Sequence, residues 1–532
     1  MALATVKELR KSLAPYESYP LQDLLTRAAR RFGSNIAVVD GERTYTYSQL
    51  SEHSDRLSSA LAGLGVGKGD RVAILAPNCA EFVIAFFGIL KAGAVVTTIN
   101  SGYREREIAH QLNDSGAEPL IVHESLKGMA DLARDDVRGL KRDIVIRPDS
   151  SDSGSFWGLL ENAPASPPNA AIDPRNDLAV LPYSSGTTGL SKGVMLTHYN
   201  LSSNVEQFTR RDGEEANLKA NDVILTHLPL FHIYGMNVLM NGAIGAGATQ
   251  VMMGRFDMDE FLDIMSGHGV SVLFTVPPVG LGLTQYPGVR ETDLSALRVG
   301  FFGAAPLSED MQQRVQDSLG VPIIQGYGMT ESSPVTNADF MEPHLIRHGS
   351  IGPAMPDNEE KVVDLETGER EMPFGEIGEL LVRGPQVMRG YYNNQAATAE
   401  TLSENGWLHT GDIVRMDADG YVWVLDRKKE LIKYKGFQVP PAELEGVLLE
   451  HPGISDAAVV GKDDLESGEI PKAFVVAGQG VELSAEDVMS FVAGKVATFK
   501  HVREVEFTDA IPKNPSGKIL RRTLIERERE RG

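Results

Sequence analysis

One segment in the first half of the chain combines the residue types that hold phosphate groups. Residues 181–198 read Leu-Pro-Tyr-Ser-Ser-Gly-Thr-Thr-Gly-Leu-Ser-Lys-Gly-Val-Met-Leu-Thr-His. Glycines let backbone amides approach an anion closely, and hydroxyls and an ammonium donate hydrogen bonds to phosphate oxygens. The candidate donors are Ser184, Ser185, Gly186, Thr187, Thr188 and Lys192. The spacing is not the Walker pattern, because Gly193 follows Lys192, so the segment is either a different phosphate loop or a polar turn.

Further segments carry residues that could act beside such a loop. Each also has a plainer interpretation: Glu331 as the acid of a helix N-terminus, Asp412 as a surface aspartate of a glycine-bounded hairpin, Lys518 as a solvated lysine and His232 as a core histidine. The segments are Leu228-Pro-Leu-Phe-His-Ile-Tyr-Gly235, Gly303-Ala-Ala-Pro-Leu307, Gln325-Gly-Tyr-Gly-Met-Thr-Glu331, Gly406-Trp-Leu-His-Thr-Gly-Asp412 and Pro512-Lys-Asn-Pro-Ser-Gly-Lys518.

Taken together and in this order, these strings resemble the adenylate-forming superfamily, which contains acyl-CoA synthetases, 4-coumarate–CoA ligases, firefly luciferase and peptide-synthetase adenylation domains. The resemblance extends from about residue 20 to 522. One departure is Ser191, where the family usually has proline. The resemblance implies ATP, Mg²⁺ and coenzyme A as cofactors or co-substrates.

The resemblance also implies a role for each part of the nucleotide site. Glu331 and Thr188 would hold Mg²⁺, because a carboxylate beside a polyphosphate is repulsive without a metal. Lys518 would be the catalytic lysine that bridges the substrate carboxylate and the α-phosphate. Tyr327 would pack on adenine, Thr330 would reach the phosphate, and Asp412 and Arg427 would hold the ribose. Lys435 and Gly436 would meet the CoA thiol arm. The other implied contacts with nucleotide or CoA are Arg255, Ala305, Gln325, Gly326, Lys429, Lys433 and Gln438.

The same resemblance places an acyl pocket behind His232, whose side chain would border the substrate. The implied lining is Tyr234, Val238, Phe301, Ala304, Gly328, Pro334 and Val335. Plant 4-coumarate–CoA ligases carry a lysine where Phe301 stands, so a ring hydroxyl would lack its polar partner here. We expect an apolar tail, either a medium-to-long fatty acid or an unsubstituted arylacrylic acid.

The expected reaction joins a carboxylic acid to CoA through an acyl-adenylate, with release of pyrophosphate and AMP. A rival reaction is loading of an amino acid or acyl group onto a carrier protein. The region between Asp222 and Asp257 has no carboxylate for an amino acid's ammonium, and the 14 residues after Lys518 lead us to expect no fused carrier domain. A luciferase-like oxygenase would share all of these motifs. Lys518, Glu331 and Lys192 together argue against a non-enzymatic nucleotide-binding regulator.

The elements that must position these residues alternate between strands and helices. A strand at Arg71–Leu75, a helix at Ala80–Lys91 and a strand at Ala94–Ile99 form a βαβ unit, and similar alternation recurs between residues 223 and 325. The expected fold is α/β: a large N-terminal domain of layered α/β subdomains with a β-rich subdomain from about residue 361, and a small mobile α+β C-terminal domain. We place the boundary at a hinge at Asp426, which gives domains 1–425 and 426–532.

Composition limits the classes that remain. The 532-residue chain carries a net charge of −22, which argues against a nucleic-acid or anionic-membrane surface. No apolar run reaches the roughly 18 residues that span a membrane, and the N-terminus lacks the apolar core of a signal peptide. The single cysteine, Cys79, rules out an intramolecular disulfide and suits a reducing compartment. We therefore expect a cytoplasmic protein that acts on small molecules.

Overall fold

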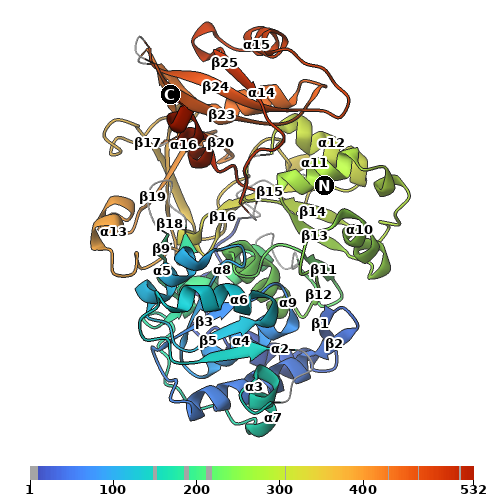
Figure 1. The fold of residues 1–532 in the computed structure, drawn as a ribbon, viewed down its shortest axis with the longest axis vertical. Coiled ribbons are helices and arrows are strands. Elements are labelled where there is room, and N and C mark those ends of the chain that lie inside the picture. The colour runs from blue at the N-terminus through green and yellow to red at the C-terminus, as the bar shows by residue number, and fades with distance from the viewer. Residues whose placement is uncertain are drawn as a thin grey trace.

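A computed structural model describes residues 10–147, 152–184, 191–210, 218–305, 307–428, 430–435, 437–464, 467–514 and 517–531. Two large sheets form the lower and middle parts of the molecule in Figure 1. The eight-stranded sheet runs in the order β16 (Val335–Ala338), β15 (Ile323–Gly328), β14 (Val299–Phe302), β13 (Val272–Thr275), β11 (Val223–Thr226), β12 (Thr249–Met252), β1 (Ile36–Asp40) and β2 (Arg43–Thr46). The six-stranded sheet runs in the order β10 (Leu196–Thr197), β7 (Leu178–Val180), β4 (Val95–Thr98), β3 (Arg71–Leu75), β5 (Leu120–His123) and β6 (Asp143–Ile146).

Most strands in these sheets pair in parallel, as the βαβ pattern predicted. The helices associated with these sheets are α2 (Asp23–Phe32), α3 (Tyr47–Gly63), α4 (Ala80–Lys91), α5 (Glu105–Ser115), α6 (Glu124–Arg134), α7 (Phe156–Asn162), α8 (His198–Arg210), α9 (Gly242–Ala246), α10 (Met258–Gly267), α11 (Pro277–Gln285) and α12 (Glu309–Leu319). Helix α4 has the predicted bounds, and all its residues are buried. It contacts β1 of one sheet and β3 and β4 of the other, which explains why its sequence is apolar on every face.

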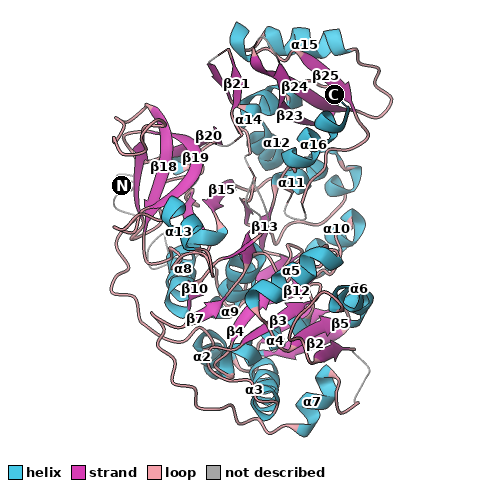
Figure 2. Ribbon diagram, turned by 60° about the vertical axis from the view of Figure 1, so that its left-hand side comes forward, coloured by secondary structure: helices cyan, strands magenta, loops and turns pink. Residues whose placement is uncertain are grey.

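A smaller antiparallel sheet follows where the sequence predicted a β-rich subdomain. Its strands are β17 (Glu359–Val363), β18 (Ile377–Arg383), β19 (Leu408–Met416) and β20 (Val422–Arg427), with helix α13 (Gln395–Thr401) beside it. In Figure 2 this sheet stands between the lower layers and the last part of the chain.

The last part of the chain has a sheet and a core of its own. The strands are β21 (Ile432–Tyr434), β22 (Phe437–Val439), β23 (Ile454–Asp464), β24 (Gly468–Ala477) and β25 (Glu504–Phe507), and the helices are α14 (Pro441–Leu449), α15 (Ala485–Ala493) and α16 (Arg521–Arg531). Their buried side chains form two clusters drawn from residues 432–524. The predicted fold class, layered α/β subdomains with a β-rich part and a small α+β C-terminal unit, is confirmed.

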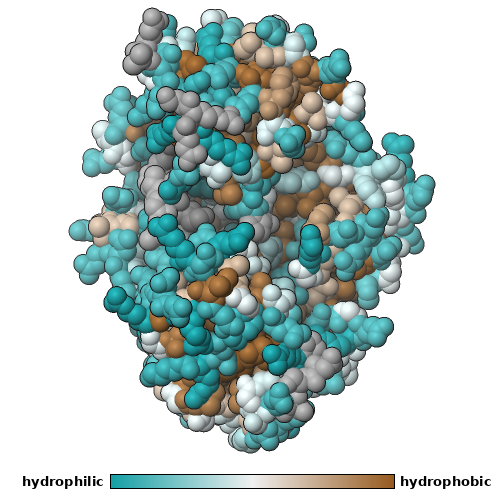
Figure 3. All heavy atoms as spheres, viewed as in Figure 1, coloured by the Kyte–Doolittle hydropathy of each residue, from teal (hydrophilic) through white to brown (hydrophobic). Residues whose placement is uncertain are grey.

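Hydrophilic residues spread over much of the face in Figure 3, with hydrophobic residues in patches between them. Among the described residues, none of the helices has the length and apolar character required to cross a bilayer.

Candidate active site

One large cavity, of about 1490 Å³, lies where the carboxyl ends of β4, β13, β14 and β15 meet the β17–β20 sheet and the C-terminal region. Ligands in open α/β sheets bind at such carboxyl ends. Residues far apart in the sequence, from Thr98 to Arg522, converge here. The predicted site residues that line the cavity are Ser184, Lys192, His232, Tyr234, Val238, Phe301, Ala304, Gly328, Gly326, Tyr327, Thr330, Glu331, Pro334, Val335, Arg427 and Lys518.

The ends of the expected phosphate loop are held by a two-stranded hairpin of β8 (Tyr183–Ser184) and β9 (Lys192–Gly193). Ser184 is paired directly with Lys192, so both side-chain donors stand at the mouth of the loop. The four predicted donors between them, Ser185, Gly186, Thr187 and Thr188, lie outside the described residues.

Two residues of helix α5 hold this hairpin, and sequence reasoning missed both. The Tyr183 hydroxyl donates to Asp114 Oδ2 at 2.6 Å, and His110 Nε2 lies 3.0 Å from the Ser191 carbonyl oxygen. Neither interaction has a local signal in the sequence, because the partners are 69 and 81 residues apart.

Glu331 is a buried carboxylate at the same mouth. Its Oε1 accepts hydrogen bonds from Ser184 Oγ at 2.9 Å and from the Tyr391 hydroxyl at 2.8 Å. The Lys192 ammonium lies 4.8 Å from the centre of the Tyr391 ring. Mg²⁺ is commonly held by one or two carboxylates together with substrate phosphates, and a single buried carboxylate beside phosphate donors fits that pattern.

Asp412 is buried on β19 and is not among the cavity-lining residues, whereas its neighbour Gly411 and its partners Tyr327 and Arg427 are. Tyr327 donates its hydroxyl to Asp412 Oδ2, and Arg427 Nε lies 2.9 Å from Asp412 Oδ1. The charge of Asp412 raises the pKa of Arg427 above its usual value, while burial first and Asp412 second raise the pKa of Tyr327. The guanidinium therefore stays charged and the phenol stays neutral, and the Tyr327 ring lines the cavity.

Gln325 on β15, a predicted nucleotide contact, does not line the cavity. It is buried, and its side-chain amide forms hydrogen bonds with the Leu307 backbone and with the Gln312 side chain, which fixes the position of Leu307. Ala304 of that segment lines the cavity with a φ of 67°, a conformation that non-glycine residues rarely adopt and that often marks functional sites. Ala305, next to it, is half-buried.

Lys518 enters the cavity from a turn in the C-terminal region. Asn514 closes the turn, because its Oδ1 accepts from Lys518 N at 2.9 Å and its N–H donates to the Lys518 carbonyl oxygen at 2.9 Å. Gly517 has a φ of 81°, and a Cβ there would lie 2.9 Å from Pro278 Cγ on α11. The glycine is required both by the turn and by this close approach.

Two titratable groups, Lys518 and His232, lie beside the expected acyl pocket, and burial and neighbouring charges set their charge states. Burial, reinforced by the charge of Arg427, lowers the pKa of Lys518 to about 8. Burial and the nearby Lys518 charge lower the pKa of His232 to about 4, so the imidazole is neutral at pH 7. Its Nδ1 accepts from Tyr234 N at 3.2 Å, which puts the ring proton on Nε2.

We call the part of the cavity lined by Tyr234, Val238, Phe274 and Phe301 the acyl arm, because the acyl pocket is expected there. Its walls are largely aromatic. Phe301 stacks on Phe274, with ring centres 4.9 Å apart and planes at 20°. Tyr234 and Val238 come from a π-helix, Tyr234–Asn241, a rare element that is frequent at functional sites. Sequence periodicity did not predict it. Lining residues missed from the sequence are Phe208, Leu218, Phe231, Phe274 and Phe302.

The remaining predicted positions lie elsewhere. Arg255, Lys433 and Lys435 are exposed and do not line the cavity. Lys429 and Gly436 lie outside the described residues, as does the side chain of Gln438.

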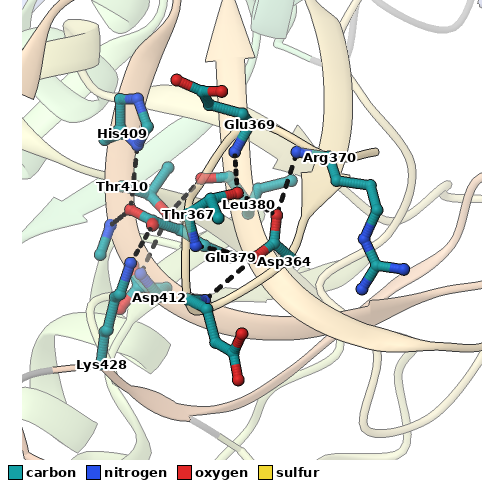
Figure 4. Close-up of polar contacts among 12 residues, drawn as sticks. Asp364, Thr367, Glu369, Arg370, Glu379, Leu380, His409, Thr410, Asp412 and Lys428 are labelled. Carbon is teal, nitrogen blue, oxygen red and sulfur yellow. Dashed lines mark hydrogen bonds and ion pairs between the residues drawn. The ribbon is translucent and has the colours of Figure 1, made fainter. Parts of the chain in front are cut away.

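Glu379 on β18 is a further cavity residue that the sequence did not indicate (Figure 4). Its carboxylate accepts from Lys428 Nζ at 2.9 Å and Gly411 N at 3.2 Å, and His409 Nδ1 lies 3.4 Å away. Burial alone would raise the pKa of Glu379, but His409 and Lys428 outweigh it and leave the pKa lowered. Glu379 thus connects β18 to Lys428, the residue that directly follows β20.

Comparisons with known proteins agree with this geometry. A family model described as "AMP-binding enzyme" matches residues 25–392, and "AMP-binding enzyme C-terminal domain" matches residues 443–518. The chain is 41% identical to a 4-coumarate–CoA ligase of Pinus taeda over 519 residues, which covers 96% of this chain and 95% of the relative. A 4-coumarate–CoA ligase of Oryza sativa subsp. japonica is 43% identical over 510 residues, covering 92% and 88%.

Solved structures give the same result. An anthranilate–CoA ligase in complex with anthranoyl-AMP superposes with a TM-score of 0.88 at 28% identity, covering 96% of this chain and 97% of that one. A fatty acyl CoA synthetase of Mycobacterium tuberculosis has a TM-score of 0.75 at 30% identity, covering 96% and 98%. The two family models match residues 25–392 and 443–518, and many of the predicted site residues line one cavity. This chain therefore belongs to the AMP-binding enzyme family.

Proposed function

We propose that this protein is an AMP-forming acid–thiol ligase that joins an arylacrylic acid, or an acid with a similarly apolar tail, to coenzyme A. One observation carries the proposal: phosphate donors, an aromatic-walled arm, and the two side chains that contact Asp412 (Tyr327 and Arg427) line one cavity, together with Lys518. The relatives named 4-coumarate–CoA ligase support the substrate class.

In the first half-reaction an oxygen of the substrate carboxylate attacks the α-phosphorus of ATP, and pyrophosphate leaves. Lys192 and the hydroxyls of its loop hold the leaving group. The Lys518 ammonium lies between the carboxylate and the α-phosphate, where it offsets the negative charge that crowds the transition state. Asp412 accepts the ribose hydroxyls, since each of its oxygens can take a further hydrogen bond. Mg²⁺, held by Glu331 and the phosphates, would supply further charge neutralisation.

In the second half-reaction the thiol of CoA attacks the acyl carbonyl, AMP leaves, and the thiol proton is lost. No enzyme nucleophile is required, because the adenylate already carries the activation. Lys518 occupies the cavity beside the acyl arm, so it must withdraw to admit the thiol. We place the pivot at Asp426, which divides the chain into residues 1–425 and 426–532, and Lys435 and Gly436 then meet the thiol arm.

The apolar arm selects the acid. Stacked Phe274 and Phe301 offer flat faces to an aromatic ring and no hydrogen bond to a ring hydroxyl. We therefore favour a cinnamate-like acid without a polar ring substituent over a hydroxycinnamate.

A pyrophosphate-release assay with a panel of cinnamic, hydroxycinnamic, benzoic and fatty acids tests this function. We expect ATP-dependent pyrophosphate release that is highest with unsubstituted arylacrylic acids, and an acyl-CoA product with AMP when CoA is added. Pyrophosphate release without thioester formation would indicate a carrier protein as acceptor. Absence of AMP formation with every acid would contradict the proposal.

A further inference from the structure

Tyr391 stands between the two charged groups at the phosphate end of the cavity. It is 7% exposed, its hydroxyl donates to Glu331 Oε1 at 2.8 Å, and its ring faces the Lys192 ammonium at 4.8 Å. The hydroxyl is a neutral donor, because a phenol has an ordinary pKa of about 10. One side chain therefore contacts both the carboxylate and the cation.

The backbone fixes Tyr391 against both partners. In the segment 388–392, Met388 N donates to the Glu331 carbonyl oxygen at 2.9 Å and Tyr392 N donates to the Gly193 carbonyl oxygen at 2.8 Å. Tyr391 N donates to Thr398 Oγ1 of helix α13 at 2.9 Å. The segment thus joins the turn that carries Glu331 to the strand that carries Lys192.

The contacts direct both charged groups. Two hydrogen bonds to Oε1, from Ser184 and Tyr391, fix the rotation of the Glu331 carboxylate and so aim its other oxygen. The electron-rich face of the ring attracts the Lys192 ammonium without neutralising it. The described residues show no ion pair between Lys192 and Glu331, and the neutral Tyr391 side chain contacts both groups.

We propose that Tyr391 is a positioning residue that sets Glu331 and Lys192 on either side of the place where the nucleotide phosphates bind. This inference rests on the proposed function, in which Glu331 faces a divalent cation and Lys192 faces phosphate. Groups that orient a metal ligand typically affect metal affinity about 10- to 100-fold.

The two contacts can be separated by substitution. Tyr391→Phe removes the hydroxyl and keeps the ring, whereas Tyr391→Leu removes both. Tyr392→Phe is the matched control, because it makes the same chemical change one residue away, and among the described contacts none joins the Tyr392 side chain to Glu331 or Lys192. Ser184→Ala removes the other donor to Glu331 Oε1. It is measured in place of Tyr391→Phe if that variant does not fold.

The measurement is binding, not turnover. Mn²⁺, which is detectable by electron paramagnetic resonance, is titrated into enzyme with an ATP analogue whose α,β-bridging oxygen is replaced by methylene. Calorimetry gives the affinity for the same analogue without metal. We expect Tyr391→Phe to weaken Mn²⁺ binding about tenfold and leave metal-free analogue binding within about twofold. Tyr391→Leu should also weaken metal-free binding, by about three- to tenfold.

Equal Mn²⁺ affinity in Tyr391→Phe, Tyr392→Phe and the parent enzyme would overturn the inference. A Glu331→Gln variant in the same titration separates this result from a failure of the proposed function. If Glu331→Gln loses Mn²⁺ binding while Tyr391→Phe does not, the role of Tyr391 is wrong and the site stands. If Glu331→Gln binds Mn²⁺ normally, the assignment of Glu331 is wrong, and the positioning role of Tyr391 falls with it.

Discussion

At the scale of single residues, Lys518 is the group on which we propose that the first half-reaction depends. The hydrogen bonds of Asn514 close the segment that carries Lys518, and Gly517 lies so near Pro278 that an added Cβ would collide. Lys518→Ala should slow adenylation about 10²–10³-fold, as expected for the loss of one preorganised transition-state donor. Pyrophosphate–ATP exchange measures this step. Thioester formation from supplied acyl-adenylate should change far less, and an equal loss in both steps would contradict the assignment.

The lowered pKa of Lys518 predicts a pH dependence. The ammonium is present below its pKa of about 8 and is lost above it, so kcat/KM for ATP in the adenylation step should fall above about pH 8. Lys518→Arg keeps its charge to a much higher pH, so any activity it retains should stay level there. A pH–rate profile without CoA checks this, and the same decline in both proteins would assign it to another group.

We propose that Phe301, which lines the cavity and stacks on Phe274, determines the character of the acyl arm. Phe301→Lys would place an amine donor near a ring hydroxyl and remove the stack on Phe274. The ratio of kcat/KM for 4-coumarate over cinnamate should rise about tenfold, or about 1.4 kcal/mol. A neutral buried lysine would reduce this change without reversing it. An unchanged ratio in a folded, active variant would mean that Phe301 is a core residue.

At the scale of elements, β18 and the end of β20 are joined by Glu379 and Lys428 (Figure 4). Lys428 follows the proposed pivot by two residues, so this ion pair can form in one of the two arrangements and must break in the other. Lys428→Met should slow adenylation about three- to fivefold, because a partly exposed pair contributes up to about 1 kcal/mol. Thioester formation from supplied adenylate should not slow. The two half-reactions are measured separately.

The matched control is Lys495→Met. Lys495 pairs with Glu450, and both residues belong to the C-terminal unit, so this pair moves as one body. Lys495→Met should leave the ratio of the rates of the two half-reactions unchanged. Equal effects of the two substitutions would argue that Lys428 contributes general stability and no bias between arrangements.

At the scale of the whole molecule, Lys518 lines the cavity, which is the arrangement that we propose for adenylation. Asp426 is buried near the end of β20, where it accepts from Ala442 N of α14 at 3.2 Å, and burial raises the pKa of this carboxyl to about 7. Proline fixes φ near about −65° and resists the change that a rotation requires. Asp426→Pro should therefore retain adenylation while CoA transfer collapses.

Asp426→Asn separates the loss of charge from the loss of backbone freedom. We expect it to support both half-reactions, since the amide oxygen can still accept from Ala442 N. If Asp426→Pro carries out both steps at the rates of Asp426→Asn, the pivot lies elsewhere. Single-turnover measurements of each step provide the comparison.

The sequence by itself determined the elements and the order of the chemical groups. Period-2 and period-3.6 apolar patterns are local, so α4 and the strands on either side of it were predicted almost to the residue. The glycine-rich strings, through their resemblance to the adenylate-forming superfamily, indicated which residues would meet a nucleotide.

Only the tertiary structure decided how distant groups combine. The contacts of Tyr391 with Glu331, of Glu379 with Lys428 and of Tyr183 with Asp114 join residues 49 to 69 positions apart, which no local pattern encodes. The π-helix at Tyr234 depends on packing as well, since a Cβ on Gly235 would lie 2.2 Å from the Pro229 carbonyl oxygen. Local propensity specifies what each segment can become, whereas the orientation of a carboxylate, an ammonium or an aromatic wall is set by neighbours that the fold brings together.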